Sequence, residues 1–203
     1  MPSLDDVLDH SPAGDFFMDC EDIERDYERL CKREGVDPRD KNPELRTEAE
    51  EKARNRAMKA YDGAVSKIRW FFYQNERLDV YREIYVDDIQ GFIDSISKYG
   101  RSMYQDEMRG VGYYWAWDIG HAFSYGHSGK GGMPIILVST IGCDDIDLEM
   151  TIGDYMMFTS KESGISEGEN EINLIEGRRI VLEQILTRDG KNLIEGRKIE
   201  AWT

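Results

Sequence analysis

The stretch from Gly110 to Gly126 contains the residues best suited to hold a flat ligand. Its sequence, Gly-Val-Gly-Tyr-Tyr-Trp-Ala-Trp-Asp-Ile-Gly-His-Ala-Phe-Ser-Tyr-Gly, predicts a strand followed by a helix. Tyr114 lies on the predicted strand and Tyr125 on the predicted helix. Because rings from two different elements can close on both faces of a heteroaromatic group, the stretch predicts an aromatic clamp.

Three charged residues outside this stretch could act on a bound ligand. Arg82 lies in the middle of a predicted strand, from which a guanidinium can reach a phosphate or a ribose. Glu169 and Glu171 are two positions apart, so on a strand both carboxylates point to the same side. Two carboxylates suit a reaction that passes through an oxocarbenium-like ion, because one stabilises the sugar cation and the other handles a proton.

In this order the three blocks resemble the ADP-ribosyltransferase family. The family pattern has an Arg or His on the first strand, a strand centred on Ser or Tyr and followed by a helix, and a Glu that begins a later strand. Residues 110–125 are similar to the Gly-x-Gly-Ile-Tyr-Phe-Ala…Tyr segment of the poly-ADP-ribosyltransferase and diphtheria-toxin branch, and residues 170–175 to its Asn-Glu strand. Arg82 and Glu169-Asn-Glu171 match the arginine-modifying branch instead. The resemblance covers roughly residues 78–187 and gives a hybrid motif, Arg82–Tyr114–Glu171.

The resemblance implies an α+β fold whose split β-sheet binds NAD as co-substrate. It implies that the nicotinamide lies between Tyr114 and Tyr125, and that the cofactor-binding set is Arg82, Glu83 (through its backbone), Tyr114, Trp115 and Tyr125. It assigns catalysis to Glu171, which stabilises the sugar cation, to Glu169, which orients or deprotonates the nucleophile, and to Tyr114. The loop 158–168 is expected to touch the target.

The function that follows from the resemblance is mono-ADP-ribosylation of a macromolecule inside a cell. The formal net charge of −15 repels nucleic acid, so a protein target is favoured. One alternative is an inactive relative that binds a protein or acts as an acidic decoy. Another is an NAD glycohydrolase toxin with water as the acceptor. A bacterial or phage effector would fit either activity, with an inhibitor or antitoxin protein as a further partner.

Other classes of site find no support in the residue pattern. The cysteines at 20, 31 and 143 lack C-x-x-C spacing, so neither a zinc site nor a disulfide framework is expected. Residues 126–132 lack the spacing of a phosphate-binding loop, and no Gly-x-Ser-x-Gly segment occurs. We expect no metal and no membrane span, and the absence of a secretory pattern at the N-terminus predicts a cytoplasmic protein.

The elements that must position these residues fall into two parts. Residues 1–77 are predicted to form a helical appendage, with helices over 16–34 and 43–74 that pack together through alanines. Residues 78–203 are predicted to form the ADP-ribosyltransferase-like catalytic domain. Within this domain we expect a strand over 80–86, a short helix from Asp88 to Gly100, a central strand over 133–141 and a hairpin over 171–185 that turns at residues 176–177.

Overall fold

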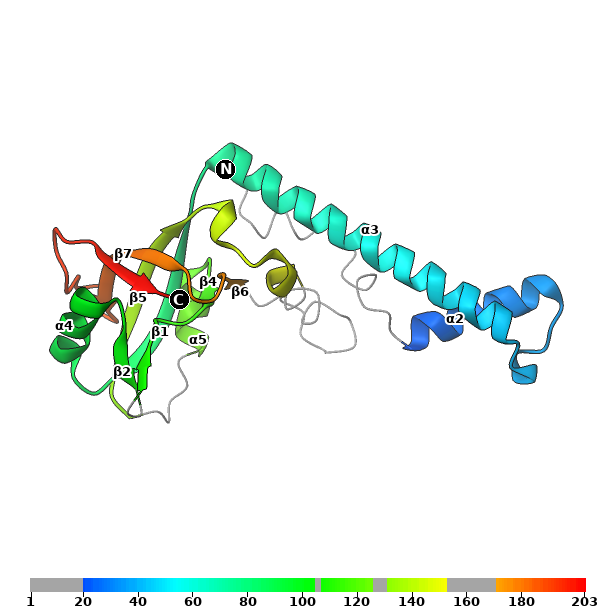
Figure 1. Ribbon diagram of the computed structural model, residues 1–203, viewed down its shortest axis with the longest axis horizontal. Coiled ribbons are helices and arrows are strands. Elements are labelled where there is room, and N and C mark those ends of the chain that lie inside the picture. Colours follow the sequence, from blue (N-terminus) through cyan, green and yellow to red (C-terminus); the bar gives the residue numbers. More distant parts are fainter. Residues whose placement is uncertain (1–19, 105–106, 126–130, 153–170) are drawn as a thin grey trace. The chain divides into compact units, whose positions relative to one another are not determined.

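The computed structural model describes residues 20–104, 107–125, 131–152 and 171–203 (Figure 1). Residues 20–68 belong, with Ile152, to one compact unit, which we call the helical unit. The described residues of 69–151 and 171–203 belong to a second, the sheet unit. The predicted boundary after residue 77 lies later in the chain than this division, because the last turns of the long helix count with the sheet unit. No helix in the described part of the chain has the length and apolar character needed to cross a membrane.

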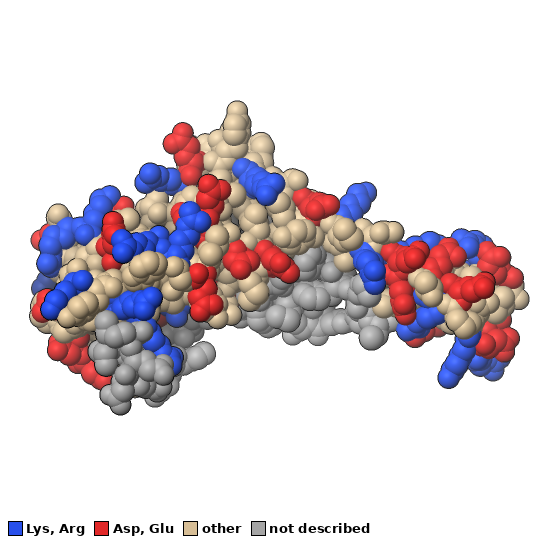
Figure 2. All heavy atoms as spheres, viewed as in Figure 1, with Lys and Arg blue, Asp and Glu red and all other residues tan. Residues whose placement is uncertain are grey.

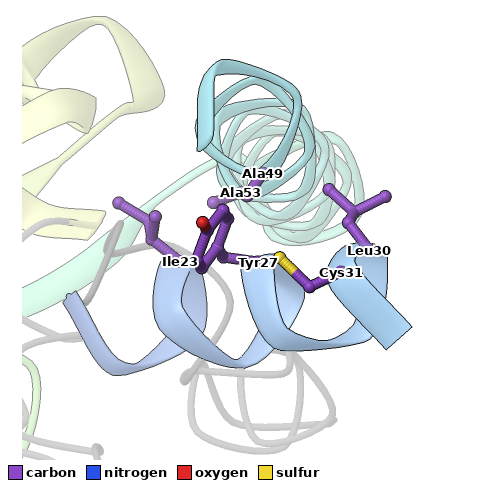
Figure 3. Close-up of a cluster of buried hydrophobic side chains, with 6 residues drawn as sticks. All are labelled: Ile23, Tyr27, Leu30, Cys31, Ala49 and Ala53. Carbon is purple, nitrogen blue, oxygen red and sulfur yellow. The ribbon is translucent and has the colours of Figure 1, made fainter. Parts of the chain in front are cut away.

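The helical unit is built on two helices, α2 (Cys20–Glu34) and the long α3 (Pro43–Asn75), joined by the short 3-10 helix η2 (Pro38–Asp40). Side chains of α2 at helical spacing point toward α3, where small residues let the two backbones approach (Figure 3). The shared core consists of Ile23, Tyr27, Leu30, Cys31, Ala49 and Ala53. The predicted packing of the two helices through alanine is therefore confirmed for the described residues.

A buried tyrosine fixes the connection between the two helices. The hydroxyl of Tyr27 donates to the carbonyl of Pro38 at 3.4 Å and accepts from the backbone N–H of Asn42 at 2.8 Å. The side chain of Asn42 in turn accepts from the N–H groups of Glu44 at 3.0 Å and Leu45 at 3.2 Å, which caps the start of α3. Pro43 then occupies the first helical position, where its missing N–H costs nothing.

Among the described residues of this unit, one carboxylate is buried, and it carries an ion pair. Asp26 on α2 is 6% exposed, and its Oδ2 lies 2.5 Å from Nη1 of Arg56 on α3. Arg29 reaches the other oxygen at 3.5 Å. Because a buried charge is tolerated only when it is paired, this contact fixes the alignment of α2 along α3.

The sheet unit contains a six-stranded sheet in which every neighbouring pair is antiparallel. The order of the strands across the sheet is β6-β4-β1-β5-β7-β8. Their bounds are β1 (Leu78–Val86), β4 (Tyr114–Ala116), β5 (Met133–Ile141), β6 (Glu171–Asn173), β7 (Arg179–Thr187) and β8 (Ile199–Trp202). The protein is thus an α+β fold with an N-terminal helical part, and the predicted interior position of residues 133–141 is confirmed.

Helices α4 and α5 and a small ribbon also belong to the sheet unit. Helix α4 (Ile89–Tyr99) begins after Asp88, whose side chain accepts from the N–H of Gly91 at 3.0 Å, and ends at Gly100 in the left-handed conformation. Both predicted caps of this helix are confirmed. Helix α5 (Ile119–Tyr125) packs against β1 and β4, and β2 (Ser102–Tyr104) pairs with β3 (Glu107–Arg109).

The predicted hairpin over residues 171–185 is wrong. The chain turns at Glu176 and Gly177 as expected, but β6 pairs with β4 and β7 lies between β5 and β8. Gly177 donates to the carbonyl of Thr203 at 3.3 Å, and Arg178 accepts from the N–H of Thr203 at 2.9 Å. The turn is therefore held by the end of β8, and each strand reaches partners in a different half of the sheet.

Candidate functional site

Arg82 lies on β1 with its guanidinium at the start of β4. Its Nη1 donates to the backbone carbonyl of Tyr114. Its Nε is buried and has no hydrogen-bond partner within the described part of the chain. Burial lowers the pKa of the Arg82 guanidinium from its ordinary value, and the nearby Glu171 carboxylate and the Tyr113 and Tyr114 phenols oppose this lowering.

Gly112 makes room for this guanidinium. The residue has a φ of +87°, and a β-carbon built on it would lie 2.6 Å from Nη2 and 2.7 Å from Cζ of Arg82. Gly110 is constrained in the same way, since its β-carbon would lie 2.3 Å from the carbonyl oxygen of Trp202. Gly110 is therefore required by its close approach to the backbone of β8, and Gly112 by its positive φ, with the Arg82 side chain filling the space beside it.

The predicted strand-to-helix transition is present, with β4 leading into α5. Tyr114, the first residue of β4, is 38% exposed and pairs with Asn173 of β6. Trp115 is only 2% exposed and donates from Nε1 to the carbonyl of Gly112 at 2.8 Å. The side chain of Trp115, which the resemblance assigns to cofactor binding, thus supports the Gly110–Gly112 segment from within the core.

Glu171 is the first residue of β6 and is half-buried. Through the register of the sheet it pairs with Ala116 of β4, which pairs with Tyr81 of β1, the neighbour of Arg82. Burial lowers the pKa of the Arg82 guanidinium, and the Glu171 carboxylate raises it in part. The sheet therefore places the three residues of this cluster, Arg82, Tyr114 and Glu171, on neighbouring strands. The register assigns Tyr114 and Glu171 to one face and Arg82 to the other, and the arginine reaches the start of β4 at the backbone carbonyl of Tyr114.

Tyr113 belongs to the same cluster and was not predicted from the sequence. Its ring centroid lies 4.3 Å from that of Tyr114, at an interplanar angle of 42°, and its phenol is close enough to act on the pKa of Arg82. Its carbonyl accepts from the N–H of Leu174 at 2.8 Å, just beyond β6. The sequence offers one signal for Tyr113, the pair of tyrosines that follows Gly112. Because Gly112 has a positive φ, the residue after it need not follow the in-and-out alternation of a strand, so both rings can lie close together.

The side chain of Glu83 makes an ion pair, and the cofactor-binding role expected of its backbone stays a prediction. Its carboxylate is fully buried and binds Arg188 twice, Oε1 to Nε at 2.8 Å and Oε2 to Nη2 at 3.1 Å. Nη2 of Arg188 also donates to the hydroxyl of Tyr85 at 3.2 Å. Because alternate residues of a strand share a face, this pair lies on the side of β1 opposite to Arg82, the side to which the register also assigns Tyr114 and Glu171.

Part of the predicted site lies outside the described residues. These are Glu169, the side chain of Tyr125 and the loop 158–168, whereas the backbone of Tyr125 ends α5. The nicotinamide clamp of Tyr114 and Tyr125 therefore stays a prediction. Among the residues that the structure describes, no group of three or more His, Cys, Asp or Glu side chains is placed to hold a metal ion.

A comparison with protein-family models, one with curated proteins and one with solved structures found no match to this chain.

Proposed function

We propose that the chain is an NAD-dependent mono-ADP-ribosyltransferase that moves ADP-ribose from NAD to a macromolecular target. The observation that supports this function is the adjacency of β1, β4 and β6 in the sheet. Each of these strands carries one residue of the motif, Arg82, Tyr114 or Glu171, in the order in which the ADP-ribosyltransferase family arranges them.

The donor and acceptor set of the cluster suits NAD. The guanidinium of Arg82 can donate to a phosphate or to a ribose oxygen, and its buried Nε lacks a partner in the described part of the chain. The paired rings of Tyr113 and Tyr114 offer an aromatic surface beside it. Glu171 is a half-buried acceptor for a ribose hydroxyl. These groups would hold the nicotinamide-ribose half of the molecule.

NAD would supply the glycosidic bond and nicotinamide as its leaving group. Glu171 would accept a hydrogen bond from the ribose 2′-hydroxyl and stabilise the positive charge on the sugar, since a fixed carboxylate in a half-buried site interacts strongly with developing charge. A nucleophile of the target forms the new bond to the sugar carbon and gives up its proton, a step that the resemblance assigns to Glu169. A protein target is favoured, because the net charge of −15 opposes the approach of nucleic acid.

The test is incubation of the full chain with a cell lysate and NAD labelled in its ADP-ribose half. We expect labelled protein and released nicotinamide, and a loss of both by roughly 100-fold or more in Glu171→Gln, the scale typical of losing one group that stabilises transition-state charge. Glu195→Gln is the matched control, because Glu195 is exposed in a turn of the same unit. Circular dichroism of both variants controls for folding.

Each other result identifies a different function. Free ADP-ribose without labelled macromolecule means that water is the acceptor and that the chain is an NAD glycohydrolase. NAD binding by calorimetry without release of nicotinamide means a binding protein that does not catalyse. If neither binding nor release is found with the native chain, the proposal is wrong.

A further inference from the structure

The strand that carries Glu171 lies at the edge of the six-stranded sheet. On its inner side β6 pairs with β4, and in the described part of the chain no strand pairs with its outer side. The residues that follow the 3-10 helix η3 (Cys143–Asp145) lie along that outer side instead, with Ile146 bridged to Leu174. These residues therefore decide how firmly β6, and Glu171 with it, is held in the sheet.

A buried threonine binds both backbone groups that Asn173 of β6 turns outward. The side chain of Thr151 is inaccessible to solvent. Its hydroxyl accepts from the N–H of Asn173 at 2.9 Å and donates to the carbonyl of Asn173 at 3.3 Å. We call these two bonds the Thr151 clasp. The clasp satisfies groups that a further strand would otherwise bind.

A helical turn over residues 148–152 holds Thr151 in place. The carboxylate of Asp147 accepts from the N–H of Met150 at 3.0 Å, and the carbonyl of Asp147 accepts from the N–H of Thr151 at 2.9 Å. The N–H of Asp147 itself donates to the carbonyl of Asn173 at 2.8 Å. Both ends of this turn are thus bonded to the same residue of β6.

The clasp lies beside the proposed motif. Asn173 is the partner of Tyr114 in the sheet, and Glu171 lies two residues before Asn173 on the same face of β6. A shift of β6 at Asn173 therefore moves the Glu171 carboxylate relative to Tyr114 and Arg82. A catalytic group that is misplaced by roughly 1 Å can lower a rate by on the order of 100-fold.

We propose that Thr151 is a positioning residue for Glu171. Its hydroxyl fixes β6 where the Glu171 carboxylate can stabilise the sugar cation. Thr151 acts through the strand and not by contact with NAD, since its side chain is fully buried. This inference rests on the proposed ADP-ribosyl transfer.

The clasp contains no charged group, although charges are frequent around it. The sequence just before Thr151 carries Asp144, Asp145, Asp147 and Glu149, and Figure 2 shows both acidic and basic side chains over the sheet unit on the face that it draws. A neutral substitution at residue 151 leaves all these charges in place. Its effect on the reaction therefore reports on the hydroxyl and not on the field around Glu171.

The test compares Thr151→Val with Thr151→Ser in the full chain, by nicotinamide release from NAD well below the unfolding temperature of each variant. Val keeps the shape of Thr without the hydroxyl, and Ser keeps the hydroxyl. We expect Thr151→Val to lower kcat about tenfold and to change KM for NAD less than about twofold, because Glu171 acts on charge in the transition state. Thr151→Ser should retain kcat within about twofold.

Thr140→Val is the matched control. It removes a hydroxyl that donates to the Asp79 carboxylate at 2.8 Å, on β5 of the same unit, and should leave kcat within about twofold. Hydrogen exchange of the Asn173 amide, followed by NMR, checks the clasp without the reaction. Thr151→Val should speed this exchange about tenfold, and Thr140→Val should not.

Asp147→Ala decides the matter if Thr151→Val does not fold. This variant removes the carboxylate that caps the turn carrying Thr151, and it leaves the threonine in place. It should speed exchange of the Asn173 amide and lower kcat a few-fold at constant KM. Unchanged kcat in a folded Asp147→Ala would then overturn the proposal.

Four results overturn the positioning role and leave the proposed function standing, provided that the native chain releases nicotinamide and Glu171→Gln does not. These are full kcat in Thr151→Val, a rise in KM without a fall in kcat, an equal loss in Thr151→Ser, and unchanged exchange of the Asn173 amide in Thr151→Val. If the native chain releases no nicotinamide, the proposed function is wrong and the positioning role is overturned with it.

Discussion

The guanidinium of Arg82 lies against the α-carbon of Gly112, so closely that a β-carbon at position 112 would be 2.6 Å from its Nη2. The motif arginine and the glycine-rich segment are therefore parts of one packing arrangement. Space at residue 112 decides whether the arginine can reach the carbonyl of Tyr114.

Gly112→Ala should destabilise the sheet unit more than Gly177→Ala does. Both glycines have positive φ, so each substitution costs about 1–2 kcal/mol in backbone strain. A β-carbon at residue 177 meets no described atom within 4 Å, whereas the one at residue 112 adds overpacking of roughly 1–3 kcal/mol. Urea unfolding measures both. When Arg82 is also replaced by Ala, Gly112→Ala should lower the free energy of unfolding no more than Gly177→Ala does. A larger loss that persists without the Arg82 side chain would contradict the assigned clash.

Arg56→Ala should destabilise the helical unit by about 1–3 kcal/mol, because it leaves the carboxylate of Asp26 buried without its main partner. Arg54→Ala is the control, since it is the same substitution at an exposed position of the same helix. Thermal unfolding followed by circular dichroism at the helical signal compares the two. Equal effects would mean that the Asp26–Arg56 pair adds nothing to stability.

The thiol of Cys143 should react slowly with iodoacetamide at neutral pH. Burial raises the pKa of this thiol, and the Asp144 carboxylate raises it further, while Arg69 lowers it. A raised pKa means less thiolate at a given pH, so the midpoint of the alkylation rate should lie above about 8.5, the usual thiol value. Peptide mapping by mass spectrometry follows this cysteine alone.

Two substitutions test the direction in which Asp144 and Arg69 shift the pKa of Cys143. Asp144→Asn should move the midpoint of Cys143 alkylation to lower pH, and Arg69→Ala should move it to higher pH. Glu149→Gln, at an exposed position nearby in the sequence, serves as the control and should leave it in place. A shift of either variant in the opposite direction would rule out the assigned causes.

Tyr113→Ala should raise the dissociation constant for NAD about five- to tenfold, if the proposed site is correct, because stacking on an aromatic ring contributes about 1–1.5 kcal/mol. Tyr113→Phe should retain most of the affinity. Calorimetry measures both, with Tyr99→Ala as the control, since Tyr99 is 53% exposed on α4. Unchanged affinity in Tyr113→Ala, with a loss in Tyr114→Ala, would remove Tyr113 from the site.

Short-range sequence patterns were sufficient to predict the bounds of most helices and strands. Asp88 and Gly100 bound α4 because capping depends on residues within one turn of the helix end. The apolar run 133–141 is interior because both of its faces must be covered. The chain reversal at residues 176–177 could also be predicted from neighbouring residues. The pairing of β6 and β7 could not, because their partner strands lie far away in the sequence.

Residue types and their order along the chain were enough to propose the motif residues of the candidate site, but not their neighbours. Arg82, Tyr114 and Glu171 lie on adjacent strands, a relationship that family resemblance can suggest and that composition cannot. Tyr113 was missed because a strand pattern assigns neighbouring residues to opposite faces, and a glycine with positive φ suspends that rule. The engagement of Glu83 by Arg188 was also invisible, because the two residues meet only after β5 and β7 have paired.

The strand order has a consequence for how the chain folds. β1 pairs with β5 on one side and with β4 on the other. β4 also pairs with β6, although more than fifty residues of sequence separate these two strands. Closing such long loops is slow compared with forming helices. Arg82, Tyr114 and Glu171 therefore reach neighbouring strands only when β6 has paired with β4, and an early folding intermediate with native helix content would have no site.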